Sequence, residues 1–147
     1  MTYQHILIAT DLSPECHLVL DPATQLQKLL GCTLSLVHVI EPLSMSFGAD
    51  VPMDLGILQE QQTRQAGERL NEVLPGWPGL QRENCHLRYG QPKAEIHQLA
   101  EEISCDLILV GSHGRHGLAL LLGSTASDLL SAAPCDVLAV NLQKHKH

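Results

Sequence analysis

Aromatic residues are scarce in this chain of 147 residues, at 3% of the total. The core must therefore be aliphatic, and the stacking platforms typical of proteins that bind single-stranded nucleic acid are disfavoured. Lysine and arginine are also few, nine residues against sixteen acidic ones, and they form no cluster. The resulting net charge of -7 argues against nucleic acid and against acidic membranes as partners.

Cysteine motifs and long apolar runs are missing as well. The five cysteines are odd in number and never spaced C-x-x-C, which disfavours a zinc site or a disulfide framework and favours a reduced, cytoplasmic protein. No apolar stretch reaches the length of a membrane span, and the first residues show no signal-peptide pattern. We therefore expect no membrane association and a single domain over residues 1–147.

Short apolar runs alternate with amphipathic segments along the chain. Runs without polar alternation are typical of strands that are buried on both faces of a parallel sheet. Strand–helix alternation predicts an α/β fold, a single doubly wound (Rossmann-like or flavodoxin-like) domain with right-handed crossovers. The expected strands are residues 5–9, 33–40, 84–89, 107–110 and 137–140, and the expected helices are residues 14–30, 54–73, 92–105 and 124–132.

The first helix has clear boundary signals. Ser13 suits the N-cap, Pro14 suits the first helical position, and Gly31 suits the C-terminal end. Pro22 inside this segment predicts a kink or a late start. Leucines near the ends of the first and last helices are expected to face inward: Leu29, Leu30, Leu129 and Leu130.

The most distinctive stretch runs from Val110 to Thr125. It follows an apolar run, holds four glycines, and ends in Gly-Ser-Thr, which suits a helix start. A strand, a glycine-rich loop and a helix N-terminus together bind phosphate, because backbone N–H groups converge there. The same residues are also compatible with a tight turn followed by an ordinary capped helix.

Polar residues follow two of the expected strands. In open parallel sheets, ligands bind beyond the carboxyl ends of strands, where the strand order reverses. If strands 5–9 and 107–110 flank that point, Asp11 faces the glycine-rich loop and would bind a ribose hydroxyl or help to hold a metal ion. Alternatively, Asp11 caps the turn into the first helix. Neither the P-loop motif nor G-x-G-x-x-G is present.

Several segments together resemble the universal stress protein family. They are the opening His-Ile-Leu-Ile-Ala-Thr-Asp-Leu-Ser, the strand Leu36–Ile40, the glycine-rich signature from Leu107 to Ser124, and Ala133–Leu138. The similarity covers nearly the whole chain. It implies a five-stranded parallel sheet in the order 3-2-1-4-5 and a homodimer paired through the last strand, Val137 to Leu142. It also implies a regulatory stress-response protein that binds an adenine nucleotide, ATP or AMP.

The resemblance also implies where the nucleotide would bind. Asp11 would contact the ribose or the adenine end, and the backbone of Val39 would contact adenine. The glycine-rich segment would hold the phosphates, bridged by Mg²⁺ or Mn²⁺, and His113 and Arg115 are further candidates for phosphate contacts. The implied nucleotide-binding residues are Thr10, Asp11, Val39, Val110, Gly111, Gly114, Gly123, Ser124 and Thr125.

One spacing departs from the family pattern. The family has nine residues between the second glycine and the G-S/T pair, whereas eight separate Gly114 from Gly123 here. A dimeric scaffold of the same family that binds no nucleotide is therefore a second hypothesis. A slow ATPase is a third and ranks last, because no base or lysine typical of phosphoryl transfer is in place. His38 is expected to be a structural sheet residue, and Cys135 a small core residue.

Overall fold

The computed structural model describes residues 3–41, 55–112 and 129–141. Within these residues five strands form one sheet in the order β3-β2-β1-β4-β5, and every neighbouring pair is parallel. The expected fold class and strand order are therefore confirmed. The strands are β1 (His5–Ala9), β2 (Thr33–Ile40), β3 (Cys85–Tyr89), β4 (Leu107–Ser112) and β5 (Asp136–Asn141). The helices are α1 (His17–Leu30), α3 (Leu55–Val73) and α4 (Pro92–Glu102).

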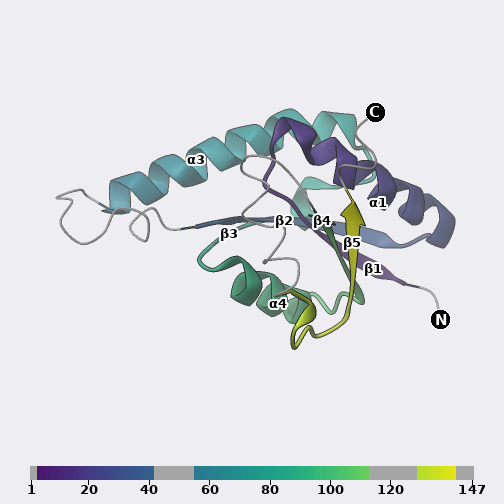
Figure 1. Ribbon diagram of the computed structural model, residues 1–147. Helices are drawn as coiled ribbons and strands as arrows, with labels where there is room; N and C mark the ends of the chain where they lie inside the picture. The colour runs from purple at the N-terminus through teal and green to yellow at the C-terminus, as the bar shows by residue number, and fades with distance from the viewer. Residues whose placement is uncertain (1–2, 42–54, 113–128, 142–147) are drawn as a thin grey trace.

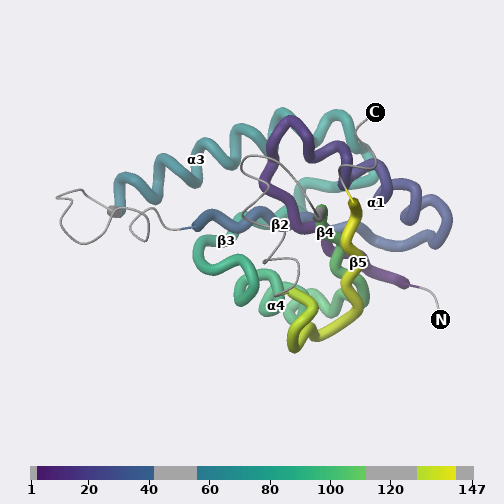
Figure 2. The backbone as a smooth tube through the Cα atoms, viewed as in Figure 1, coloured from purple at the N-terminus to yellow at the C-terminus, as the bar shows by residue number. Residues whose placement is uncertain are grey.

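Helices cover both faces of the sheet (Figure 1). The helices α1 and α3 lie on one face, and α4 lies on the other. This arrangement follows from right-handed crossovers. The chain moves in one direction from β1 through β2 to β3, which places α1 and α3 together, and it then returns to β4 across the opposite face. Figure 2 traces the same path along the backbone.

The core is centred on β1 and β4. Their side chains from Ile6 to Ala9 and from Leu107 to Val110 are all buried. Because helices cover both faces, inward and outward positions along these strands are equally removed from water, as their unbroken apolar runs predict. The aromatic side chains of Tyr3 and Trp77 pack against this aliphatic core while remaining partly exposed.

The start and end of the first helical segment follow their capping residues. Ser13 Oγ accepts a hydrogen bond from Glu15 N at 3.3 Å, and a 3₁₀ turn with Pro14 at its start leads into α1. At the other end, Gly31 has a φ of 66°, a left-handed conformation that favours glycine. Pro22 lies inside α1, which starts only at His17, after that turn.

The inward orientation expected for two leucines is wrong. Leu29 is 81% exposed and Leu130 is 61% exposed. Leu29 lies on the last turn of α1, whereas the buried residues of this helix all lie between Leu18 and Ala23, in its first half. Leu130 directly follows Leu129, which is fully buried. Consecutive helical residues point about 100° apart, so Leu130 points well away from the direction in which Leu129 is buried.

Candidate functional site

The carboxyl ends of β1, β2 and β4 meet at one edge of the sheet. Ala9, the last residue of β1, pairs with Val37 on β2 and with Val110 on β4. The chain leaves β1 toward β2 and β3 on one side and returns to β4 on the other, so the strand order reverses between β1 and β4. Ligands of open parallel sheets bind at this position.

Thr10 follows β1 and is held by three hydrogen bonds. Its N–H donates to Val37 O at 3.1 Å, and its carbonyl accepts from His38 Nδ1 at 3.0 Å. The hydroxyl oxygen accepts from Leu12 N at 3.4 Å. Because Thr10 is also buried, the structure assigns it to shaping the loop that follows β1.

Asp11 caps the turn between β1 and the first helical segment. Its Oδ1 accepts a hydrogen bond from Ser13 N at 3.0 Å. Leu12 between them has a φ of 60°, an uncommon left-handed conformation for a leucine, and its buried side chain anchors the turn. A carboxylate offers about four lone-pair positions, so this bond leaves capacity for a ligand hydroxyl. The capping interpretation of Asp11 is thus realised, and the ribose interpretation stays a prediction.

The backbone of Val39 faces the space beyond the end of β1. The β1–β2 ladder ends at Val37, three residues before the end of β2. On the β1 side of β2, Val37 O accepts a hydrogen bond from Thr10 N. On the β3 side, Ile40 O accepts a hydrogen bond from Gly90 N. Backbone groups alternate between the two sides of a strand. The N–H and C=O of Val39 are therefore directed, like those of Val37, toward the β1 side, past the last paired residue.

His38 joins β2 to the end of β1, as its interpretation as a structural residue predicts. The Thr10 carbonyl can only accept, so His38 Nδ1 carries the proton in this bond, which leaves Nε2 as an acceptor in the neutral ring. Burial lowers the pKa of His38, although the bond to Thr10 and the charge of Asp11 act in the opposite direction. The sequence pattern alone does not assign His38 to the candidate site. Its position one residue before Val39 is the signal that could have done so.

The carboxyl end of β4 lies at the same edge of the sheet as Asp11. Val110 is buried, and Gly111 continues the β4–β5 ladder opposite Val140. The strand extends to Ser112, two residues beyond the predicted end. The other candidate residues fall outside the described part of the chain: His113, Gly114, Arg115, Gly123, Ser124 and Thr125.

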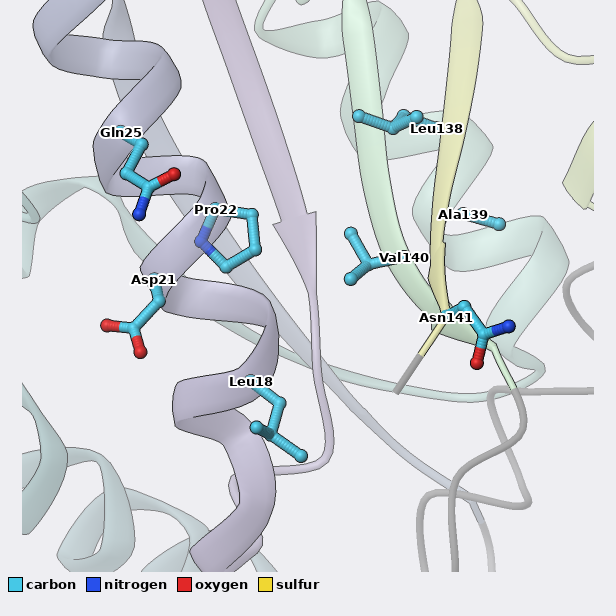
Figure 3. A pocket seen from close by; sticks show the side chains of 8 residues that line it. All are labelled: Leu18, Asp21, Pro22, Gln25, Leu138, Ala139, Val140 and Asn141. Atoms are coloured by element: carbon cyan, nitrogen blue, oxygen red, sulfur yellow. The ribbon is translucent and has the colours of Figure 1, made fainter. Parts of the chain in front are cut away.

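A separate hollow lies between α1 and β5 (Figure 3). Its volume is about 540 Å³. Leu138 and Val140 of β5 point toward α1, whereas Ala139 and Asn141 point the other way. Leu138 is 43% exposed, and β5 is the last strand of the sheet. An apolar face thus stays open at this edge. The lining residues are Leu18, Asp21, Pro22, Gln25, Leu138, Ala139, Val140 and Asn141.

Two kinds of feature are absent from the part of the chain that the structure describes. Among residues 3–41, 55–112 and 129–141, no group of three or more histidine, cysteine, aspartate or glutamate side chains could hold a metal ion. In the same ranges no helix has both the length and the apolar character needed to cross a membrane.

A parallel sheet with reversed strand order and polar groups at its carboxyl ends defines the doubly wound α/β proteins that bind ligands at strand ends. The model of one such group, described as "Universal stress protein family", matches residues 2–141. The chain belongs to the universal stress protein family.

Known relatives agree with this assignment. Universal stress protein A homolog 1 of Coxiella burnetii is 39% identical over 140 residues, which span 95% of this chain and 97% of that protein. The solved structure of UspA from Lactobacillus plantarum matches with a TM-score of 0.75 at 22% identity, over 96% of this chain and 99% of that one. A universal stress protein solved in complex with cAMP matches with a TM-score of 0.57 at 22% identity, over 97% and 99% of the two chains.

Proposed function

We propose that this protein binds an adenine nucleotide, ATP or AMP, at the carboxyl ends of β1, β2 and β4. The observation that carries the proposal is the backbone of Val39, whose N–H and C=O are directed past the end of β1. An adenine ring presents a donor and an acceptor along one edge, which complements one residue's N–H and C=O. The Asp11 carboxylate follows β1 at this end and suits a ribose hydroxyl.

The phosphates would be bound mainly by backbone N–H groups. Gly111 and Ser112 are the last residues of β4 that pair with β5, and the sequence continues with further glycines and with the Gly-Ser-Thr segment from Gly123. With so few basic residues in the chain, neutral N–H donors suit the anion, and His113 and Arg115 are additional candidates. Mg²⁺ or Mn²⁺ would be bound through phosphate oxygens. The relative solved with cAMP supports an adenine ligand.

Calorimetric titration of nucleotide-stripped protein with Mg-ATP and Mg-AMP tests the proposal. We expect micromolar binding that Gly114→Val abolishes. Asp11→Asn should weaken binding roughly 10- to 100-fold, because a charge-assisted hydrogen bond contributes about 1.5–3 kcal/mol. The asparagine oxygen still accepts from Ser13 N, so the turn is retained. Asp21→Asn, an exposed carboxylate on α1, is the matched control and should bind like the wild type.

The spacing between Gly114 and Gly123 favours a second candidate function, a dimeric scaffold that binds no nucleotide. One residue fewer in a phosphate loop displaces the last N–H groups by up to about 3.5 Å. The absence of binding heat up to millimolar ATP, from protein that circular dichroism shows to be folded, would contradict nucleotide binding and support the scaffold.

We further propose that the protein forms a homodimer through β5. This edge strand presents Leu138 to solvent, and uncovered apolar edge strands tend to pair with another chain. Light scattering coupled to gel filtration should give a dimer for the wild type and a monomer for Leu138→Glu. Leu29→Glu is the matched control, because Leu29 is an exposed leucine on the last turn of α1. A monomeric wild type would contradict the dimer.

We infer a regulatory role in the cytoplasm rather than catalysis. All five cysteines are free thiols, which fits a reducing compartment. Among the described residues, Asp11 is a carboxylate that the fold brings to the carboxyl ends of β1 and β4, and its described bond serves the turn. Any hydrolysis of ATP should therefore be slow. A phosphate-release assay that gave turnover typical of enzymes, above about 1 per second, would contradict this inference.

A further inference from the structure

Two cysteines meet at the amino ends of β4 and β5, the end of the sheet opposite the candidate nucleotide site. Cys105 Sγ and Cys135 Sγ are 3.8 Å apart, a distance at which one thiol can donate to the other. Cys105 lies two residues before the start of β4, and Cys135 lies directly before β5. Cys85 is the first residue of β3 and so lies at the same end of the sheet, but its thiol donates to Gln81 O instead.

The strand register sets the backbone of the pair at a distance suited to a disulfide. Leu107 pairs with Asp136, so one step back along both strands sets Cys135 opposite Asp106 and diagonal to Cys105. Strands about 4.8 Å apart with a rise of about 3.3 Å per residue give a diagonal Cα separation of about 6 Å. Disulfides span about 4.4–6.8 Å between Cα atoms. The sulfur atoms need to approach by about 1.8 Å to bond.

We propose that Cys105 and Cys135 form a reversible oxidation site, in which a small uncharged disulfide compound converts the two thiols to an intramolecular disulfide. The Cys135 thiolate attacks one sulfur of the compound, the S–S bond of the compound breaks, and one thiolate leaves. The Cys105 thiolate then attacks Cys135 Sγ in the mixed disulfide and releases the second thiolate. The protein loses two electrons and two protons, and the compound gains them as two free thiols.

Exposure and charge give the two thiols different parts in this reaction. Cys105 is buried, whereas Cys135 is partly exposed and is the sulfur that a reagent reaches first. Burial raises the pKa of both thiols, to about 12 for Cys105; the hydrogen bond from Cys105 partly offsets this for Cys135. The carboxylates of Asp106 and Asp136 lie close enough to raise the pKa of Cys135 further, and they also disfavour anionic reagents.

Peptide mapping of the reduced, full-length protein tests the proposal. The protein is equilibrated with 2-hydroxyethyl disulfide, alkylated and digested with trypsin. Each of the five cysteines falls in its own tryptic peptide, Cys105 in residues 94–115 and Cys135 in residues 116–144. We expect these two peptides to be joined in a product of monomer mass, with two thiols lost per chain and restored by dithiothreitol. Cys85→Ser is the matched control and should retain the cross-link.

The variant Cys135→Ala should lose the cross-link while Cys16, Cys32 and Cys85 react as in the wild type. Three wild-type results would overturn the proposal. They are mixed disulfides that persist on Cys135, a cross-link between other peptides or between two chains, and full retention of both thiols at the highest reagent concentration. Because the mapping follows covalent mass alone, it gives its answer whether or not the protein binds nucleotide.

Discussion

A disulfide between Cys105 and Cys135 should stabilise the fold by an amount that follows from the size of the closed ring. The ring runs over residues 105–135, which is about 31 residues. In the chain-entropy description, this closure removes about 12 cal/mol/K from the unfolded chain, or about 3.7 kcal/mol at 25 °C. This is a large effect, since whole domains are stable by about 5–15 kcal/mol.

The same quantity predicts a shift in melting temperature. At about 2.1 cal/mol/K per residue, unfolding this chain has an entropy of about 310 cal/mol/K, so about 3.7 kcal/mol corresponds to a rise of about 12 °C. The sulfur atoms must move together from 3.8 Å, and any strain that this movement leaves in β4 and β5 reduces the gain. We therefore expect the oxidised protein to melt roughly 5–12 °C above the reduced protein.

Scanning calorimetry of oxidised and reduced samples measures the shift, after peptide mapping has verified the cross-link. Cys85→Ser should show the same rise as the wild type, and Cys135→Ala treated with the reagent should show none. A verified cross-link that leaves the melting temperature unchanged or lowers it would refute the argument, because the two strands would then have to distort for the sulfurs to bond. A rise in the melting temperature of treated Cys135→Ala would show that the effect comes from reagent adducts and not from the cross-link.

Three further predictions concern described residues. Because the pKa of Cys135 is raised, its thiolate fraction and the oxidation rate should rise about tenfold per pH unit from pH 7 to 8, which timed alkylation measures. Asp106 accepts from the N–H groups of Gln4 and His5, so Asp106→Ala should lower the free energy of unfolding in urea by about 2 kcal/mol; an unchanged value would contradict this. Ser104 is exposed with a φ of 55°, so Ser104→Gly should raise that free energy by about 1 kcal/mol, and a loss would count against it.

Much of the fold could be predicted from hydrophobic patterning and capping. Unbroken apolar runs located β1 and β4, and Ser13 and Gly31 bounded the first helical segment. The strand order came from the resemblance to a family, because periodicity does not say which strands are neighbours. Patterning failed at Leu29, because periodicity does not show that the buried residues of α1 all lie between Leu18 and Ala23.

The candidate site could be predicted only as far as strand ends allow. Gly111 directly follows one apolar run and Asp11 comes two residues after another, so their position at the carboxyl ends was predictable. The hydrogen bond from His38 to Thr10 joins residues far apart in the chain and depends on the register of β2 against β1. The direction of the Val39 backbone likewise depends on β2 extending beyond β1, a length difference that no local pattern encodes.

The two ends of β4 carry different chemistry, and the strand between them keeps the two separable. Six consecutive residue pairs join β4 to β5, and Leu107 to Val110 are buried within that ladder. Six residues at about 3.3 Å each place the thiol pair roughly 20 Å from the carboxyl end. A densely packed strand transmits little displacement unless its packing has a second stable arrangement. The disulfide would therefore stabilise the protein by lowering the entropy of the unfolded chain, whereas the nucleotide would bind the strand ends of the folded protein. Each property is therefore tested by its own measurement.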